Sequence, residues 1–121
     1  MSARNLFAGV VALTFLAAVQ TDAQARGNAE RGKQKAEQVC AACHAVGGDW
    51  NKPLQPEYPR IAGQHYDYLV TALMAYKQGD KSLVGRKNAI MAGQVTALSK
   101  QDIEDLSAFF AAMPGSLSMR R

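Results

Sequence analysis

The sequence has no strong excess of charge of either sign. Its 121 residues include 14 lysines and arginines against 10 aspartates and glutamates, a formal net charge of +4 at pH 7. The basic residues are spread along the chain, so the sequence lacks the dense basic stripe of a nucleic-acid-binding protein. Such mild charge favours weak docking to an acidic partner. For any single lysine, an ordinary solvated surface position is at least as good an interpretation.

The sequence also lacks an apolar run of the length that a membrane span needs. The apolar stretch over residues 6–19 is shorter than the roughly 20 residues of a transmembrane helix. Arg4 precedes this stretch and the sequence A-Q-A follows it at 23–25, a pattern that predicts a cleaved signal peptide over residues 1–25. An uncleaved N-terminal anchor is the alternative. The remaining residues, 26–121, are enough for one small exported domain.

Cysteine is scarce, and both cysteines, Cys40 and Cys43, belong to one C-A-A-C-H run that ends at His44. This run is the attachment signature of c-type haem, because two thiols one helical turn apart add to the two vinyl groups while the histidine is carried to the iron. A structural zinc site needs four ligands, and the only other histidine is the isolated His65. A redox dithiol belongs beside a strand in a βαβ unit, and no convincing strand run lies near the motif. The motif therefore predicts one haem c, bound covalently through two thioethers.

Convincing strand patterns are absent, and three segments instead repeat apolar residues at helical spacings of three and four. The first helical unit begins at the N-cap Asn28, and its inward face carries the thiols. Ser99 with Asp102 is a capping-box variant that begins the last helix. The predicted order is a helical unit from 28 closed by the glycines at 47–48, a loop over 45–62, a helix from 62 or 63 to 78, a long irregular stretch over 79–98, and a helix from 99 closed at 114–115.

A few side chains invite specific interpretations. Gly32 lies inside the first predicted helix, where glycine costs about 1 kcal/mol relative to alanine. We expect it to allow close approach of the ring of Phe109 or Phe110 in the last helix. The loop leaves two roles open: Trp50 either walls the haem edge or fills the core, and Arg60 either reaches a haem propionate or is simply solvated.

A methionine in the irregular stretch is the candidate sixth ligand of the iron. Met91 lies among small and apolar residues on a segment that can be brought over the distal face of the haem. Core packing is the more usual role of a methionine. The other mature methionines are less suitable, because Met74 lies within a helix, Met113 ends the last helix and Met119 lies in the tail. His65 as a second histidine ligand is a weaker alternative than a surface histidine in the first turn of its helix.

Taken together, these stretches resemble class I cytochrome c, specifically the small bacterial periplasmic group that includes the two-haem cytochromes c, of which this chain matches one half. The matching stretches are C-A-A-C-H at 40–44, Y-P-R-I-A-G-Q-H at 58–65, Y-L-V-T-A-L-M-A-Y-K-Q-G at 68–79, I-M-A-G at 90–93 and L-S-K-Q-D-I-E-D-L-S-A-F-F at 98–110. The resemblance implies an all-α fold, a small helical bundle around one covalent haem, with its first and last helices crossing near Gly32 and Phe109.

The resemblance also implies the roles of individual residues. It implies haem thioethers at Cys40 and Cys43, iron ligation by His44 and Met91, and a hydrogen bond from Nδ1 of His44 to the carbonyl of Pro59 that fixes the imidazole. One departure is that close relatives in this group often carry a second methionine three residues after the ligand, whereas this chain has Gln94 there. This departure removes a competing ligand.

The function expected from this reading is that of a soluble periplasmic carrier that passes one electron at a time between redox proteins by Fe(II)/Fe(III) cycling. With both axial positions of the iron filled, we expect no enzymatic activity and no nucleic-acid partner. The mature form is not expected to span a membrane. The alternatives are a fixed subunit of a larger dehydrogenase or oxidase, and a haem enzyme or gas sensor with an open iron site.

Overall fold

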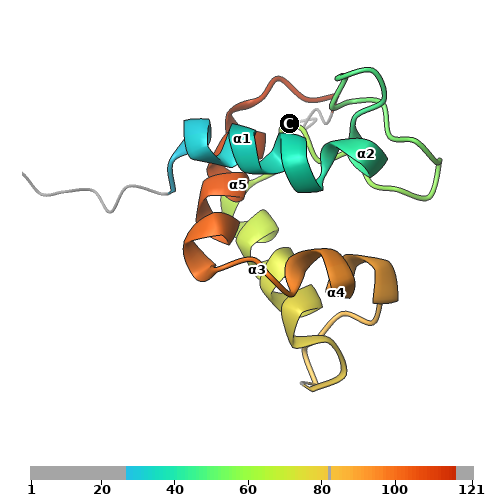
Figure 1. The fold of residues 1–121 in the computed structure, drawn as a ribbon, viewed down its shortest axis with the longest axis vertical. Helices are drawn as coiled ribbons and strands as arrows, with labels where there is room; N and C mark the ends of the chain where they lie inside the picture. The colour runs from blue at the N-terminus through green and yellow to red at the C-terminus, as the bar shows by residue number, and fades with distance from the viewer. Residues whose placement is uncertain (1–26, 82, 117–121) are drawn as a thin grey trace, which may run out of the picture.

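The computed structural model describes residues 27–81 and 83–116 (Figure 1). Its elements in chain order are α1 (Ala29–Val39), α2 (Ala41–His44), α3 (Tyr66–Gln78), the 3-10 helix η1 (Gly79–Lys81), α4 (Ala89–Val95) and α5 (Lys100–Ala112). Within those two ranges, β-type pairing is limited to one isolated bridge between Val46 and Asp49. The all-α fold class is therefore confirmed.

The N-terminal prediction falls outside this description. Residues 1–25, the predicted signal peptide, lie outside the described residues. Across 27–81 and 83–116, each helix is too short or too polar to cross a membrane.

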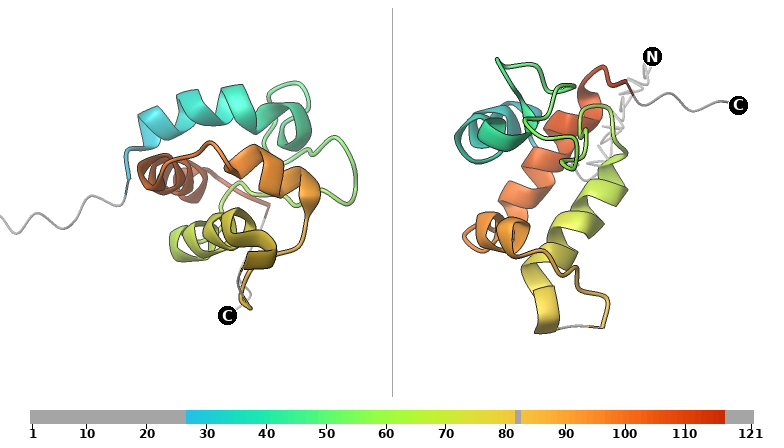
Figure 2. Two further views of the ribbon diagram at one scale, coloured as in Figure 1. Left: turned by 60° about the horizontal axis from the view of Figure 1, so that its bottom comes forward. Right: turned by 90° about the vertical axis from the view of Figure 1, so that its right-hand side faces the viewer.

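Helix α5 lies between α1 and α3, as both views of Figure 2 show. A β-carbon added to Gly32 on α1 would lie 2.0 Å from the carbonyl oxygen of Asp105 and 2.9 Å from Cβ of Phe109, both on α5. The predicted close approach at Gly32 is confirmed. Its main partner is the α5 backbone, however, and not an aromatic ring, because the two helices cross at this point.

The helix starts follow the predicted capping chemistry. The side chain of Asn28 accepts a hydrogen bond of 2.9 Å from the backbone N–H of Arg31. In α5, Ser99 Oγ accepts from the N–H of Asp102 at 3.0 Å, and the Asp102 carboxylate accepts from the N–H of Ser99 at 2.8 Å. Each contact satisfies a backbone donor that has no partner within its helix. Both predicted N-termini are confirmed.

The hydrophobic core includes residues of α5 and the side chain of Trp50. Ile103 and Leu106 of α5 are 0% and 1% exposed. Trp50 is 8% exposed and meets the rings of Phe109 and Phe110 edge-on, at centroid distances of 5.7 and 5.1 Å. Of its two proposed roles, Trp50 therefore has that of a core residue.

Two helix boundaries differ from the prediction. Helix α3 begins at Tyr66 and not at 62 or 63, because the N–H of Gly63 donates to the carbonyl of Phe110 (2.9 Å) and so ties this stretch to α5. The stretch 79–98 is not wholly irregular, since it contains η1 and α4. Asn88 caps α4 by accepting from the N–H of Met91 at 2.9 Å. Seven residues with Gly93 among them carry too little periodicity for this helix to be recognised in sequence.

Candidate haem-binding site

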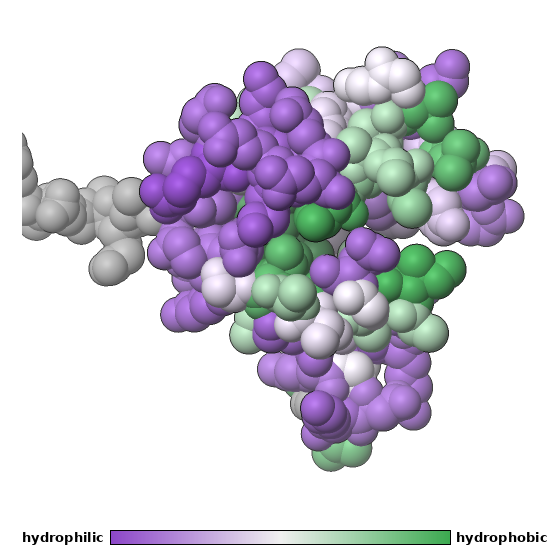
Figure 3. All heavy atoms as spheres, in the orientation of Figure 1, coloured by the Kyte–Doolittle hydropathy of each residue, from purple (hydrophilic) through white to green (hydrophobic). Residues whose placement is uncertain are grey.

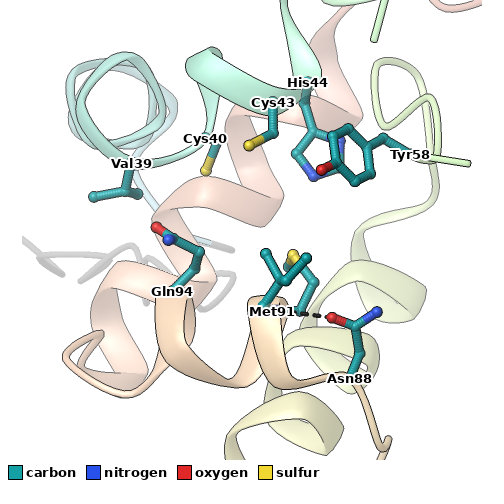
Figure 4. A pocket seen from close by; sticks show the side chains of 9 residues that line it. Val39, Cys40, Cys43, His44, Tyr58, Asn88, Met91 and Gln94 are labelled. Atoms are coloured by element: carbon teal, nitrogen blue, oxygen red, sulfur yellow. Dashed lines mark hydrogen bonds between the residues drawn. The ribbon is translucent and has the colours of Figure 1, made fainter. Parts of the chain in front are cut away.

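An open, mainly apolar pocket of about 470 Å³ lies between α2 and α4 (Figure 4). It is lined by Val39, Cys40, Cys43, His44, Tyr58, Asn88, Ile90, Met91 and Gln94. A second cavity of about 430 Å³ shares four of these residues and continues inward to side chains of α3 and α5. Because they share part of their walls, the two form one continuous cleft.

Helix α2 places the two thiols at the edge of this pocket, and Figure 4 shows both sulfur atoms facing into it. The turn is closed by a hydrogen bond of 3.0 Å from the N–H of His44 to the carbonyl of Cys40. Burial, together with the nearby thiol of Cys43, raises the pKa of Cys40 to about 12. A redox-active dithiol needs a cysteine of lowered pKa. The Cys40 environment therefore opposes the dithiol alternative.

The side chain of His44 is held in one orientation by a backbone carbonyl. Its side chain is buried, with the residue 7% exposed, and Nδ1 lies 3.0 Å from the carbonyl oxygen of Pro59. Since a carbonyl only accepts, Nδ1 is the donor in this contact, and Nε2 is the ring nitrogen left to face a metal. The ring of Tyr58 lies against the imidazole with its centroid 6.0 Å away. The contact to Pro59 is the one that the resemblance implies, while iron ligation by His44 stays a prediction.

Met91 lies on α4, on the opposite side of the pocket from His44 (Figure 4). The cap from Asn88 fixes the backbone of Met91 at the start of this helix. Gln94 lies about one turn further along α4 and also lines the pocket. The thioether of Met91 is thus the sulfur donor that faces the imidazole across the pocket.

The rejected ligand candidates lie elsewhere. Met74 and Met113 are partly buried against the hydrophobic core, and neither lines the pocket. Met119 lies outside the described residues. His65 is exposed at the N-cap of α3. Arg60 is also exposed, and its Nη1 donates to Ser116 Oγ at 3.4 Å.

Sequence reasoning missed two pocket residues, Tyr58 and Asn88. Asn88 had a detectable signal, because it stands three residues before Met91, the spacing at which an N-cap side chain meets the N3 amide. Tyr58 had no such sequence signal, because its contact with His44 depends on the conformation of the loop between them and not on a helical spacing.

These side chains fit a c-type haem. Two thiols lie at one edge, a nitrogen donor and a thioether lie on opposite sides, and the walls between them are mostly apolar. In the part of the chain that the structure describes, no three His, Cys, Asp or Glu side chains gather as a metal-ion site.

Comparison with known proteins agrees with this fit. Residues 29–114 match the family model described as Cytochrome c. Cytochrome c4 of Stutzerimonas stutzeri is 39% identical over 112 residues, which cover 89% of this chain and 51% of that protein. Cytochrome c-554(547) of Halothiobacillus neapolitanus is 34% identical over 93 residues, 72% of this chain and 98% of that protein.

A solved structure is similar as well. The crystal structure of reduced recombinant cytochrome c4 from Pseudomonas stutzeri has a TM-score of 0.65 at 39% identity, covering 75% of this chain and 48% of that one. The chain thus spans about half the length of the cytochromes c4 that it matches. The match over most of the chain shows that it belongs to the cytochrome c family, and the cofactor that its Cys40–Cys43 pair fits is one covalently attached haem c.

Proposed function

We propose that this protein is a soluble periplasmic single-haem electron carrier in which Nε2 of His44 and Sδ of Met91 bind the iron from opposite sides. The observation that carries the proposal is the position of this imidazole and this thioether on opposite sides of one apolar pocket (Figure 4). When bound, haem c supplies a one-electron Fe(II)/Fe(III) couple. Cys40 and Cys43 provide the two thioether bonds.

The residues around the pocket have distinct tasks. The carbonyl of Pro59, 3.0 Å from Nδ1 of His44, fixes the imidazole plane and makes Nε2 a better donor. A thioether from Met91 favours the softer ferrous iron and so raises the reduction potential. With His44 and Met91 both holding the iron, no coordination position would be left for a substrate, whereas a haem enzyme or gas sensor needs an open one. These features support a carrier rather than an enzyme.

Partners of this carrier are other redox proteins, and an apolar rim offers them a docking surface. Val46 is 37% exposed, Leu54 53% and Ile90 57%. Figure 3 shows hydrophobic side chains on both sides of the opening between α2 and α4. Apolar patches with a polar surround mark protein contacts, and the mild positive charge assists encounter with an acidic partner.

The same exposed rim favours one alternative, a fixed electron-transfer subunit of a larger dehydrogenase or oxidase. A permanent interface is the more apolar kind. Size-exclusion chromatography of the protein from its native source distinguishes the two, since a free carrier elutes at the size of a small domain.

Substitution of Met91 tests the axial ligands. The oxidised protein should show the weak near-infrared sulfur-to-iron band, and Met91→Ala should abolish it and give the ferrous form a carbon monoxide complex. Met74→Ala is the matched control, because Met74 does not line the pocket, and it should leave the band intact. A wild-type protein that lacks the band, or a Met91→Ala protein that keeps it, contradicts the proposal.

Export is a separate part of the proposal. A signal peptide over residues 1–25 should be absent from the mature protein, so the intact mass of haem-loaded protein from the periplasm should correspond to residues 26–121 plus one haem. A full-length protein in the membrane fraction would instead show an uncleaved anchor.

A further inference from the structure

We propose that Lys77 and Arg86 are positioning residues for Met91, fastening the two ends of the segment 86–98 to α3. We call this segment, which contains α4, the Met91 segment. The proposal rests on the proposed function, because it takes Met91 as the sixth ligand of the iron. It assigns the stability of that ligation to contacts made well outside the pocket.

The tie at the end of the segment is made by Lys77. Its Nζ donates to the carbonyl oxygen of Thr96 at 2.9 Å and to the carbonyl oxygen of Leu98. These carbonyls follow the last turn of α4, where backbone acceptors lack partners within the helix. An ammonium has three donors and makes stronger hydrogen bonds than a neutral group, so one side chain can hold two carbonyls.

The tie at the start of the segment is made by Arg86. Its backbone N–H donates to the carbonyl of Ala75 at 2.9 Å. Its guanidinium carbon lies 5.4 Å from the ring centroids of both Tyr68 and Tyr76, and Nη2 is 3.3 Å from the Tyr68 hydroxyl. A planar guanidinium between two aromatic rings is a favourable arrangement for the cation. All of these partners belong to α3.

The segment has few other anchors. Val95 and Leu98 are buried at 1% and 5% exposure, but both lie near its end. Around the ligand itself, Met91 is partly buried against the hydrophobic core, and Ile90 and Gln94 line the pocket that the haem would fill. A seven-residue helix is not stable alone. Its position over the pocket therefore depends on the two ties to α3 as well as on this small apolar contact.

A measurable consequence follows for added ligands. Imidazole from solution binds the ferric iron only after Met91 has left it. Its apparent dissociation constant is therefore the intrinsic value divided by the fraction of molecules in which the site is open. If the Met91 segment moves away as a unit, both ties must break. Removing a tie then increases the open fraction and strengthens apparent imidazole binding.

The experiment is a titration of the purified ferric haem protein with imidazole, followed by its absorbance. Lys77→Met keeps the aliphatic bulk and removes the donors, and we expect it to lower the apparent dissociation constant about tenfold, equivalent to about 1.4 kcal/mol. Lys77→Arg keeps a charged donor and should restore most of the wild-type value. Arg86→Leu should lower the constant about three- to fivefold, since its backbone hydrogen bond to Ala75 remains.

The matched control is Lys87→Met. Lys87 belongs to the same segment and carries the same charge, but its ion pair with Asp80, at 3.5 Å, is between two side chains that are about 80% exposed. It should change the imidazole constant by less than twofold. Amide hydrogen exchange of residues 89–98 gives a second readout and should be faster in Lys77→Met than in Lys87→Met.

If Lys77→Met binds imidazole as Lys87→Met does, the positioning role is wrong even though Met91 ligation stands. If the wild-type protein lacks the Met91-dependent near-infrared band, the proposed function itself is wrong, and this is seen before any Lys77 variant is made. Should Lys77→Met fail to accumulate, Arg86→Leu decides alone, and an unchanged imidazole constant in that variant overturns the proposal.

Discussion

The crossing of α1 with α5 and the Met91 segment are held by different kinds of contact. At the crossing, the backbones touch at Gly32, and Ile103 and Leu106 are almost fully buried beside it. The Met91 segment has its buried anchors near one end and otherwise depends on hydrogen bonds and a cation between two rings. Core contacts set global stability, whereas sparse polar ties allow local opening.

The charged side chains of the two regions also differ in their burial and in their partners. The carboxylate of Asp105 is buried at the crossing, where the residue is 4% exposed, and accepts hydrogen bonds from the Asn28 N–H (2.6 Å), Arg31 (2.7 and 3.1 Å) and Gln101 (2.9 Å). Lys77 and Arg86 reach backbone and ring partners nearer the surface. We therefore expect substitutions at the crossing to change unfolding, and substitutions in the segment to change ligand exchange at the iron.

The largest expected effect is at Gly32. A β-carbon 2.0 Å from the carbonyl oxygen of Asp105 forces α1 and α5 apart, so Gly32→Ala should cost about 3 kcal/mol or more. Thermal unfolding followed by circular dichroism should show a Tm lowered by about 12 °C or more. The control is Gly93→Ala on α4, where the added carbon meets nothing within 4 Å. An unchanged Tm in Gly32→Ala would show that the crossing is not the tight contact described.

The next effect is at Asp105. Burial alone would raise the pKa of this carboxyl, but hydrogen bonds from Arg31, Asn28 and Gln101 outweigh it and hold the pKa below its usual range. Because the folded-state pKa is the lower one, this network stabilises the protein above the unfolded-state pKa of about 4 and ceases to do so as pH falls through the folded-state value. Asp105→Asn should therefore lose about 2 kcal/mol at pH 7.

The pH dependence gives this prediction its specificity. The free energy of unfolding should fall less steeply below about pH 4 in Asp105→Asn than in the wild type, and the near-infrared band should be the same in both. Asp80→Asn is the control, because the Asp80 side chain is 79% exposed and its ion pair with Lys87 lies at the surface. Equal acid sensitivity of Asp105→Asn and wild type would contradict the role given to the network.

Predictability from sequence also differed between the two regions. The caps at Asn28 and Ser99 were predictable because each acts within one turn of its own helix. The carbonyl that meets Gly32 was not, since it depends on how two helices cross. Helix α4 was missed because its seven residues, Gly93 among them, show too little apolar periodicity. Its attachment to α3 is not local either, since the contacts of Lys77 join residues 19 and 21 positions apart. The haem motif could be recognised because its residues have a fixed spacing in the sequence. The position of Met91 across the pocket from His44 depends instead on the tertiary fold.

The smallest effects are expected when the N-cap asparagine of each region is replaced by alanine. Asn28 caps α1 through the N–H of Arg31, and Asn88 caps α4 through the N–H of Met91, both at 2.9 Å. Replacing an N-cap asparagine by alanine costs about 1 kcal/mol. In Asn28→Ala this cost should fall on global unfolding, lowering Tm by about 4–8 °C and leaving imidazole binding unchanged.

In Asn88→Ala the same cost should fall on local opening of the Met91 segment. The apparent imidazole constant should then drop about fivefold, while Tm changes less than in Asn28→Ala. The pair thus controls for the chemistry of the cap itself, because only its location differs. If both variants lower Tm and the imidazole constant in the same proportion, the crossing and the Met91 segment open as one cooperative unit, and the distinction between the two regions does not hold.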